Sequence, residues 1–145
     1  MPLLARKGVL AIAAVIDVAL QTHAQPISAK ALAERHGLPP RHLEPVLQAL
    51  VRDGILKGTR GPRGGYSLAR ERERVTANDI LRAAGTVEGN EKPHAGSEFL
   101  DKIVLPALAG AEEEFGVALS RISVEDMART AAKLTKHLAS PSARA

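Results

Sequence analysis

Apolar residues recur at spacings of three and four along the first part of the chain, the pattern of helices that bury one face. We expect the first such helix from about Lys7 to Thr22, ended ahead of Pro26. The start of this segment loosely resembles a secretory signal, but Asp17 interrupts the apolar run, so a core helix is the preferred interpretation. Its predicted buried stripe consists of Val9, Ile12, Ala13, Ile16, Ala19 and Leu20.

Two shorter helices follow, separated by a turn that glycine and proline mark. Ser28 is expected to cap a helix that closes at Gly37, with Leu32 and Ala33 facing inward. The next helix, predicted at Pro40–Asp53, begins on a proline, whose missing N–H would be unbonded in the first turn anyway. Its buried stripe is expected to be Leu43, Val46, Leu47 and Leu50.

A short alternating pattern comes directly after the helix pair. Ile55–Thr59 and Gly65–Leu68 predict the strands of a hairpin, and Arg60–Gly64 is its loop. A helix pair followed by a cationic hairpin is the order of parts in a winged helix-turn-helix. That arrangement places one helix in the major groove of DNA and the loop in the groove beside it.

The second half of the chain begins and ends with capped helices. Thr76 and Ser123 each have an acidic residue three positions later, a pattern that predicts a helix start. The first of these helices is expected to end at Gly85, and residues 86–97, which are polar and lack periodicity, predict an exposed loop. In the last helix a heptad spacing favours contact with a partner helix; its residues are Met127, Ala131, Leu134 and Leu138.

Between these two helices runs a longer apolar stripe with the same spacing of three and four. A domain this small cannot cover so long a helix, so we expect the stripe to meet a second copy of the chain. Pro106 lies inside this helix and is expected to kink or split it. The predicted dimer interface consists of Leu100, Val104, Leu108, Ala111, Phe115 and Ile122.

These elements together predict a mainly α fold with a small β-hairpin, namely a winged helix-turn-helix with a long dimerisation helix. At 145 residues, 45% of them hydrophobic, the chain can bury one modest core and an extension. We expect a DNA-binding domain over 1–85, an exposed loop over 86–97, dimerisation helices over 98–139 and a tail over 140–145.

Positive charge is concentrated in the half that carries the predicted helix-turn-helix. Residues 1–75 hold 12 Lys and Arg against 6 Asp and Glu, whereas residues 76–145 hold 8 against 10. Uneven charge is ordinary for a solvated surface, but here it coincides with the motif. It therefore favours double-stranded DNA as a partner.

The composition and the motifs also limit the chemistry that the chain can perform. With no cysteine it has no disulfide, zinc–thiolate site or thiolate-held iron–sulfur cluster, and a reducing cytoplasm is compatible with this. No apolar run reaches the roughly 20 residues of a membrane span. His94 with Glu91 and Glu98 is a weak metal signal on a predicted loop, and no catalytic constellation is present. We expect neither an enzyme nor a cofactor nor a membrane partner.

Arginine and glycine supply the candidate chemistry for binding DNA. Arg60 and Arg63 stand in the hairpin loop, where a guanidinium fork matches phosphate or base-edge acceptors in two-point contact. At the start of the third helix, Arg41, His42 and Glu44 point away from the apolar stripe. The complete expected set is Ser28, Arg41, His42, Glu44, Lys57, Arg60, Arg63 and Tyr66.

Each of these features also has a purely structural interpretation. A glycine-rich hairpin can carry solvated arginines, and Glu44 suits the helix dipole as well as it suits a cytosine amino group. Arg70, Arg72 and Arg74 alternate with glutamates and are interpreted mainly as a solvated charged turn. The alternative function is a protein-interaction module that docks a metabolic enzyme or another regulator, with DNA binding secondary.

Four segments together resemble the Rrf-two family of bacterial transcription regulators. They are Ala31–Leu38, His42–Glu44, Arg60–Ala69 and Thr76–Ile80, and the hairpin segment is the most specific. The family includes the iron–sulfur cluster regulator, the nitric-oxide-sensing repressor and the cysteine-metabolism repressor. The resemblance implies a homodimer that is joined through the long helix and binds an imperfect palindrome; we expect a repressor, with activation left open.

The resemblance also implies residue roles and shows two departures. By position, Arg60 matches the family's minor-groove arginine, and Glu44 matches a recognition-helix glutamate that discriminates between sites. Cluster-binding members carry three cysteines in the stretch equivalent to Thr86–Leu105, where this chain has none, so no cluster is expected. Pro45 replaces the family's usual glutamine, which removes a contact and is expected to distort the helix. Neither the operator nor an effector or protein partner follows from the sequence.

Overall fold

The computed structural model describes residues 4, 6–21, 25–88 and 97–139, without the side chains of 86–88 and 135–139. The first part contains α1 (Arg6–Ala19), α2 (Ala29–Arg35), α3 (Pro40–Arg52), β1 (Leu56–Thr59) and β2 (Gly65–Leu68). The second contains a 3-10 turn η1 (Arg72–Arg74), α4 (Ala77–Glu88), a π-helical turn η2 (Leu100–Val104), α5 (Leu105–Ser120) and α6 (Val124–Ala139). This confirms a mainly α fold with one antiparallel hairpin.

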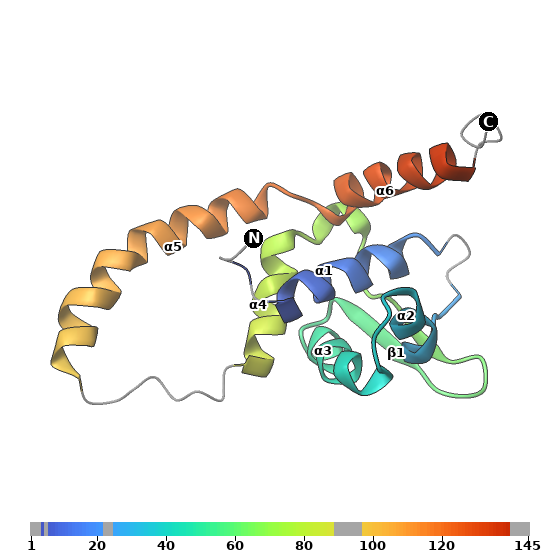
Figure 1. The fold of residues 1–145 in the computed structure, drawn as a ribbon, viewed down its shortest axis with the longest axis horizontal. Helices are drawn as coiled ribbons and strands as arrows, with labels where there is room; N and C mark the ends of the chain where they lie inside the picture. Colours follow the sequence, from blue (N-terminus) through green and yellow to red (C-terminus); the bar gives the residue numbers. More distant parts are fainter. Residues whose placement is uncertain (1–3, 5, 22–24, 89–96, 140–145) are drawn as a thin grey trace.

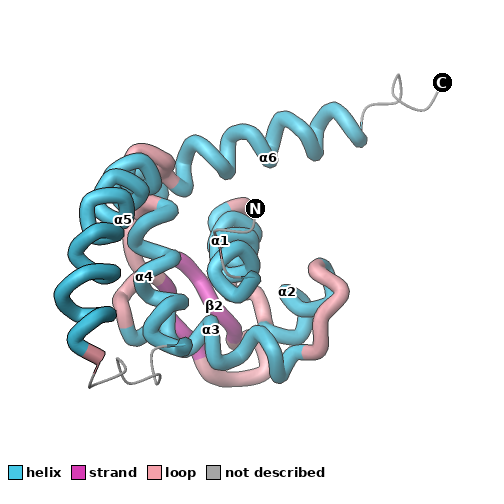
Figure 2. Tube along the Cα trace, turned by 60° about the vertical axis from the view of Figure 1, so that its left-hand side comes forward, coloured by secondary structure: helices cyan, strands magenta, loops and turns pink. Residues whose placement is uncertain are grey.

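The helices and the hairpin form a small body with two helices reaching outward from it. α1 lies across α3, α4 and the hairpin, as Figure 1 shows. The later part of α5 lies beside α4 while its first part angles away, and α6 starts on α1 and then leads away from the body (Figures 1 and 2). The body therefore carries the helix pair and the hairpin, and most of the surface of α5 is left open.

The predicted cap and turn of α2 are both present. The Ser28 hydroxyl accepts a hydrogen bond from the Ala31 N–H at 3.1 Å. At the other end Gly37 has a φ of 63°, which allows the Leu38 N–H to reach back to the Ala33 carbonyl at 2.9 Å. The turn between α2 and α3 is therefore fixed by backbone hydrogen bonds, and so is the direction in which α3 leaves it.

The end of α3 is closed in the same way and is reinforced by an arginine. Gly54 has a φ of 74°, and the Ile55 N–H bonds to the Leu50 carbonyl at 2.9 Å. The Arg70 guanidinium donates to the carbonyls of Asp53 at 2.8 Å and Gly54 at 3.1 Å. Arg70 is exposed, as expected for a solvated turn, but it also has a role that the sequence did not predict, because it satisfies carbonyls that the end of a helix leaves unbonded.

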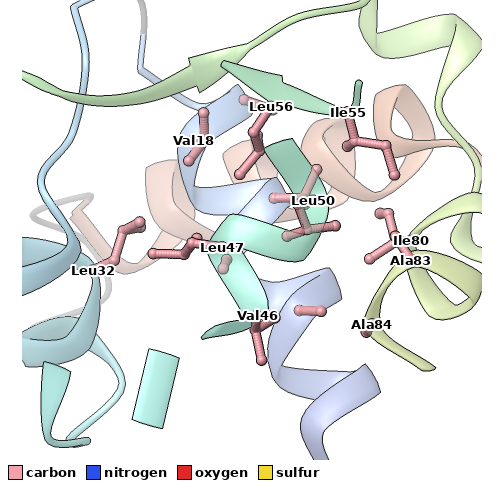
Figure 3. Close-up of a cluster of buried hydrophobic side chains, with 14 of the residues drawn as sticks. Val18, Leu32, Val46, Leu47, Leu50, Ile55, Leu56, Ile80, Ala83 and Ala84 are labelled. Atoms are coloured by element: carbon pink, nitrogen blue, oxygen red, sulfur yellow. The ribbon is translucent and has the colours of Figure 1, made fainter. Parts of the chain in front are cut away.

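The apolar stripe of α3 forms the middle of the core, as predicted. All four stripe residues are at most 2% exposed, and Figure 3 shows Val46, Leu47 and Leu50 among side chains from α1, α2, β1 and α4. Burying a leucine or valine side chain contributes roughly 1.5–3 kcal/mol, so this stripe strongly fixes how α3 is rotated about its axis. The labelled neighbours are Val18, Leu32, Ile55, Leu56, Ile80, Ala83 and Ala84.

The buried face of α1 differs from the predicted stripe. Val9 is 45% exposed, and of the predicted residues only Ala19 is fully buried. α1 is apolar on almost every side and packs against α3, α4, α6 and β2, so its sequence pattern does not select one face. The helix also ends at Ala19, earlier than expected, and Thr22 lies outside the described residues. The residues that are buried are Gly8, Ala11, Ala14, Val15, Val18 and Ala19.

The hairpin is held against the rest of the body by its own backbone. Ile27 and Tyr66 exchange two backbone hydrogen bonds, at 2.8 and 3.0 Å. A Cβ on Gly65 would lie 2.4 Å from the Ile27 backbone, and one on Gly64 would lie 2.1 Å from the Thr59 carbonyl oxygen. The glycine pair is therefore needed for two close backbone approaches, one within the hairpin and one to the segment before α2.

Two predicted boundaries in the second half are wrong. α4 continues past Gly85 to Glu88, because Gly85 is not among the glycines with positive φ and so does not close the helix. Residues 86–88 therefore belong to a helix, and 89–96 lie outside the described residues. α5 ends at Ser120, so Ile122 belongs to the connection to α6, where its carbonyl accepts the Ala77 N–H at 2.8 Å.

Pro106 does not split the long helix. The helical backbone continues from η2 into α5, and the Leu105 N–H bonds to the Leu100 carbonyl, five residues earlier. A proline in a helix lacks a donor and crowds the carbonyl four residues before it. The wider π turn directly before Pro106 accommodates the ring, a common way for a helix to tolerate such an interruption.

α6 is attached to the body at its first turns. The Val124 N–H bonds to the Val75 carbonyl at 2.8 Å, and Val124 and Ala128 are buried. Arg72 lies 2.8 Å from the Glu125 carboxylate and also donates to the Ala19 carbonyl at 3.3 Å. Arg72, like Arg70, is thus a structural residue. Of the predicted heptad, Met127 and Ala131 are half-buried, Leu134 is exposed and the Leu138 side chain is not described.

We expect the Gly65→Ala variant to lose about 2 kcal/mol or more of the free energy of unfolding, because the added Cβ collides with the Ile27 backbone. Urea unfolding followed by circular dichroism measures this. Gly58→Ala is the matched control in the same hairpin, since nothing lies within 4 Å of its Cβ position. Equal losses in the two variants would contradict the close approach.

Arg70→Ala is expected to lower the free energy of unfolding by about 1 kcal/mol, because two hydrogen bonds from a charged group to helix-end carbonyls disappear. Arg74→Ala serves as the control, since Arg74 is 79% exposed and makes only a 3.6 Å ion pair with Glu71. The same urea titration applies. An Arg74→Ala loss as large as that of Arg70→Ala would show that the capping role is wrong.

Candidate nucleic-acid interface

The exposed face of α3 carries the polar residues that the sequence assigned to it. Arg41, His42 and Glu44 are all exposed, whereas Val46 and Leu50 of the same helix are buried. None of the three forms an ion pair with a described residue. Their donors and acceptors therefore face solvent, as side chains that read a base edge or a phosphate need to do.

The hairpin carries three cationic side chains, one on β1 and two in the loop. Lys57, Arg60 and Arg63 are exposed, and within the described part of the chain none of them has an ion-pair partner. Gly61 has a φ of 110°, and its carbonyl accepts the Gly64 N–H at 2.9 Å, which keeps the loop short. Positive charge without internal compensation attracts an anionic backbone, so this loop is suited to phosphate contact.

A polar cleft of about 710 Å³ lies between the start of α2 and the hairpin loop. Ser28 and Arg63 both line it, so the structure brings these two predicted residues together. Arg35 lines the same cleft and was not identified from the sequence. Asp17 fixes its guanidinium at 2.7 Å and also contacts His36 at 3.0 Å. The single acidic residue in the apolar first helix was the available signal for this arrangement.

Two of the predicted residues already have structural roles. The Ser28 hydroxyl is engaged in capping α2, and Tyr66 is half-buried against the core while its backbone pairs with Ile27. Arg41 and His42 lie apart from the polar cleft and line a different cavity with the start of α1. The predicted set is thus divided among the start of α2, α3 and the hairpin, and no described cavity contains all of it.

Pro45 does not interrupt α3. α3 runs from Pro40 to Arg52 with Pro45 inside it, and the Pro45 side chain is exposed. The position at which the resemblance places a glutamine therefore offers an apolar ring in place of an amide. Because the proline ring has no hydrogen-bonding group, any side-chain hydrogen bond to a base from this part of α3 would come from Arg41, His42 or Glu44.

The predicted dimer stripe is largely uncovered. Leu108 is 57% exposed and Ala111 is also exposed, while Leu100 and Val104 are half-buried. Phe115, 36% exposed, lies at the edge of a groove of about 780 Å³ between α5 and α4. The side of α5 that faces α4 is therefore not the side that carries most of the stripe.

Two observations on metal ligands and membrane-spanning helices concern the described residues alone. No group of three His, Asp or Glu among them is placed to hold a metal ion, and Glu91 and His94 lie outside the description. None of the described helices has the length and apolar character that crossing a membrane requires.

Comparison with known proteins places this architecture in a family. The Rrf2 (Rrf-two) family model, described as an iron-dependent transcriptional regulator, matches residues 4–130. An HTH-type transcriptional regulator of Synechocystis is 41% identical over 80 residues, which are 55% of this chain and 54% of that protein. The regulator IscR of Xenorhabdus nematophila is 29% identical over 132 residues, 87% of this chain and 79% of its own length. The chain thus spans about half the length of the Synechocystis relative.

Solved structures agree with this. IscR of T. potens has a TM-score of 0.68 and 30% identity, covering 88% of this chain and 87% of its own. CymR, the global cysteine regulator of B. subtilis, has a TM-score of 0.65 and 26% identity, covering 88% of this chain and 96% of its own. Since the family model matches residues 4–130, which are most of the chain, the chain belongs to the Rrf2 family of transcriptional regulators.

Proposed function

We propose that the protein is a sequence-specific DNA-binding transcription regulator, in which α3 reads the major groove and the hairpin loop contacts the groove beside it. The observation that carries the proposal is the exposure of unpaired cations on both elements, held by one rigid core. The names of the relatives, HTH-type transcriptional regulators and IscR, support it.

Within this interface the residues have different chemical tasks. Arg60 and Arg63 can place guanidinium groups against phosphates or in a narrow minor groove. Glu44 is an acceptor only, so it favours a cytosine amino group and disfavours bases that present only acceptors. Ser28 and Arg63, which share the cleft between α2 and the loop, are positioned for one continuous stretch of backbone.

The active form in this proposal is a homodimer joined through α5. The long stripe beginning at Leu100 remains uncovered by the chain's own fold, and a two-fold partner would bury it against an identical stripe. Two DNA-contacting surfaces that are related by a two-fold axis bind a palindrome. The operator in this proposal is therefore an imperfect palindrome. The described part of α5 and η2 has no cysteine that could hold an iron–sulfur cluster. The protein in this proposal is therefore a repressor that acts in the cytoplasm without a bound cofactor.

Selection of bound fragments from sheared genomic DNA of the source organism, at near-physiological salt, tests the proposal. Enrichment of one palindromic sequence is expected, with log affinity falling by about 0.9 per phosphate neutralised for each unit of log salt. Binding without sequence preference would contradict the proposal.

The Arg60→Ala variant is expected to weaken binding to the selected duplex by about 1–3 kcal/mol, because a groove or base contact is lost. Fluorescence anisotropy with a labelled duplex measures the dissociation constant. Arg74→Ala removes the same charge from an exposed site beyond the hairpin and should change affinity little. Equal weakening by the two substitutions would mean that Arg60 contributes only to the overall electrostatic attraction between the protein and DNA.

Leu108→Glu is expected to shift the protein from dimer to monomer, because it places a charge in the apolar seam that two copies of α5 would share. Sedimentation velocity measures the change. Val117→Glu is the control, since Val117 is 48% exposed but lies nine residues further along, on the opposite side of the helix. A Leu108→Glu variant that stays dimeric would place the interface elsewhere.

A second candidate is a protein-interaction module. Phe99, Ile103 and Val117 are 66%, 56% and 48% exposed and lie outside the predicted dimer stripe, so apolar surface remains after dimerisation. Sequence-blind DNA binding together with a stoichiometric protein partner recovered from lysate would favour this function over the first.

A further inference from the structure

A cavity of about 800 Å³ lies where the first turn of α1, the turn after α2 and the start of α3 meet. The volume is in the range of sites that bind small molecules. It is open to solvent on one side and is separate from the polar cleft beside the hairpin. In the core these elements are already packed together, so the cavity is a formed feature of the surface.

The walls of this cavity are apolar and fixed in place. Leu10, Leu38, Pro39 and Pro45 form most of them, and the buried Val46 closes the floor. The Leu38 backbone is tied to α2 by its 2.9 Å hydrogen bond to Ala33, and two of the wall residues are prolines with a locked φ. A ligand would therefore meet a preformed surface, which keeps the entropy cost of binding low.

The rim of the cavity is positively charged. The cations are Arg6 and Lys7 from α1 and Arg41 from α3, and the imidazole of His42, also from α3, lines the cavity with them. No acidic residue is among the residues that line the cavity, and within the described chain none of these four side chains forms an ion pair. Cations drawn from two elements thus converge on one apolar opening without a counter-charge.

We propose that this cavity binds a small organic anion with an apolar body, most simply a carboxylate, and that its binding opposes DNA binding. Binding of DNA phosphates would account for the cations. It would not account for the recessed apolar walls, because a phosphate group gains little from contact with an apolar surface. A ligand with an anionic head at the rim and an apolar body against Leu38 and Pro45 uses both features.

The coupling to DNA follows from shared side chains and rests on the proposed function. Arg41 and His42 belong both to the cavity rim and to the exposed face at the start of α3. A bound anion neutralises this part of the DNA-facing surface and holds these side chains toward the cavity. Two ligands that need the same groups exclude each other, so each lowers the apparent affinity of the other.

Direct binding of 2-naphthoate, followed through its own fluorescence anisotropy, tests the site. The chain has no tryptophan and one tyrosine, so background emission is low. Saturable binding is expected, and the uncharged isostere 2-naphthamide should compete at least about tenfold more weakly because it lacks the charge. Equal affinity of the two compounds would overturn the proposed role of the cationic rim.

Matched substitutions locate the site. Lys7→Gln, on the exposed rim and outside the expected DNA-contacting set, should weaken 2-naphthoate binding about fivefold. Pro45→Gln, which replaces an apolar wall and restores a helical N–H, should also weaken it. Arg82→Gln removes the same charge beside the groove between α4 and α5 and should have no effect. Absence of saturable binding, or equal weakening by Lys7→Gln and Arg82→Gln, overturns the site.

The second arm adds 2-naphthoate to a titration with the selected duplex. The apparent dissociation constant for DNA should rise as the cavity fills, and the rise should be reduced in Lys7→Gln. Binding at the cavity with no change in duplex affinity would overturn the competition. Failure of all specific DNA binding would contradict the proposed function, whereas the fluorescence arm would still decide whether the ligand site exists.

Discussion

Burial of one face of α3 is the constraint on which the rest of the structure depends. Leu43, Val46, Leu47 and Leu50 pack against four other elements, and rotating the helix by one residue would expose them and bury charged groups. The same packing that stabilises the domain therefore decides that Arg41, His42 and Glu44 face outward. Packing of the buried face thus determines which side chains of α3 are free to contact DNA in the proposed complex.

The hairpin depends on this core through a small number of backbone contacts. Ile27 pairs with Tyr66, and Gly65 permits the close approach between the two segments. Arg70 connects the end of β2 to the end of α3 by bonding to the carbonyls of Asp53 and Gly54. The helix and the loop that would contact neighbouring grooves are thus parts of one unit, with little freedom to move separately.

The arginines of the basic half of the chain fall into two groups, those that stabilise the fold and those that remain exposed without an ion-pair partner. Arg70 and Arg72 satisfy backbone carbonyls and an internal carboxylate, whereas Arg60 and Arg63 have no ion-pair partner among the described residues. Composition alone cannot make this division, because both groups stand in the same charged region. The role of each arginine depends on whether the fold brings a helix-end carbonyl or a carboxylate near its side chain.

Local patterns predicted the elements well where one physical cause dominated. The caps at Ser28, Thr76 and Ser123 and the stripe of α3 follow from hydrogen bonding and helical periodicity, and the structure confirms them. α1 was predicted with the wrong buried face, since a helix that is apolar all round takes its orientation from its neighbours. Gly85 and Pro106 do not end their helices, because Gly85 keeps a φ that is not positive and a local π turn precedes Pro106.

For the candidate site, the sequence identified the residues of α3 and the loop but not how they group. It could not predict that Ser28 and Arg63 share a cleft with Arg35, or that Arg41 and His42 share a cavity with Arg6 and Lys7. These groupings join residues far apart in the chain, and only the packing of α1 and α2 against α3 and the hairpin brings them together.

We propose that α3 and the hairpin loop together form the DNA-contacting surface. The most direct test is amide and side-chain NMR of the protein titrated with its selected duplex. Chemical-shift changes are expected to concentrate in 40–48 and 57–66, with α6 little affected. Shift changes confined to α5 and α6, with 57–66 unchanged, would contradict it.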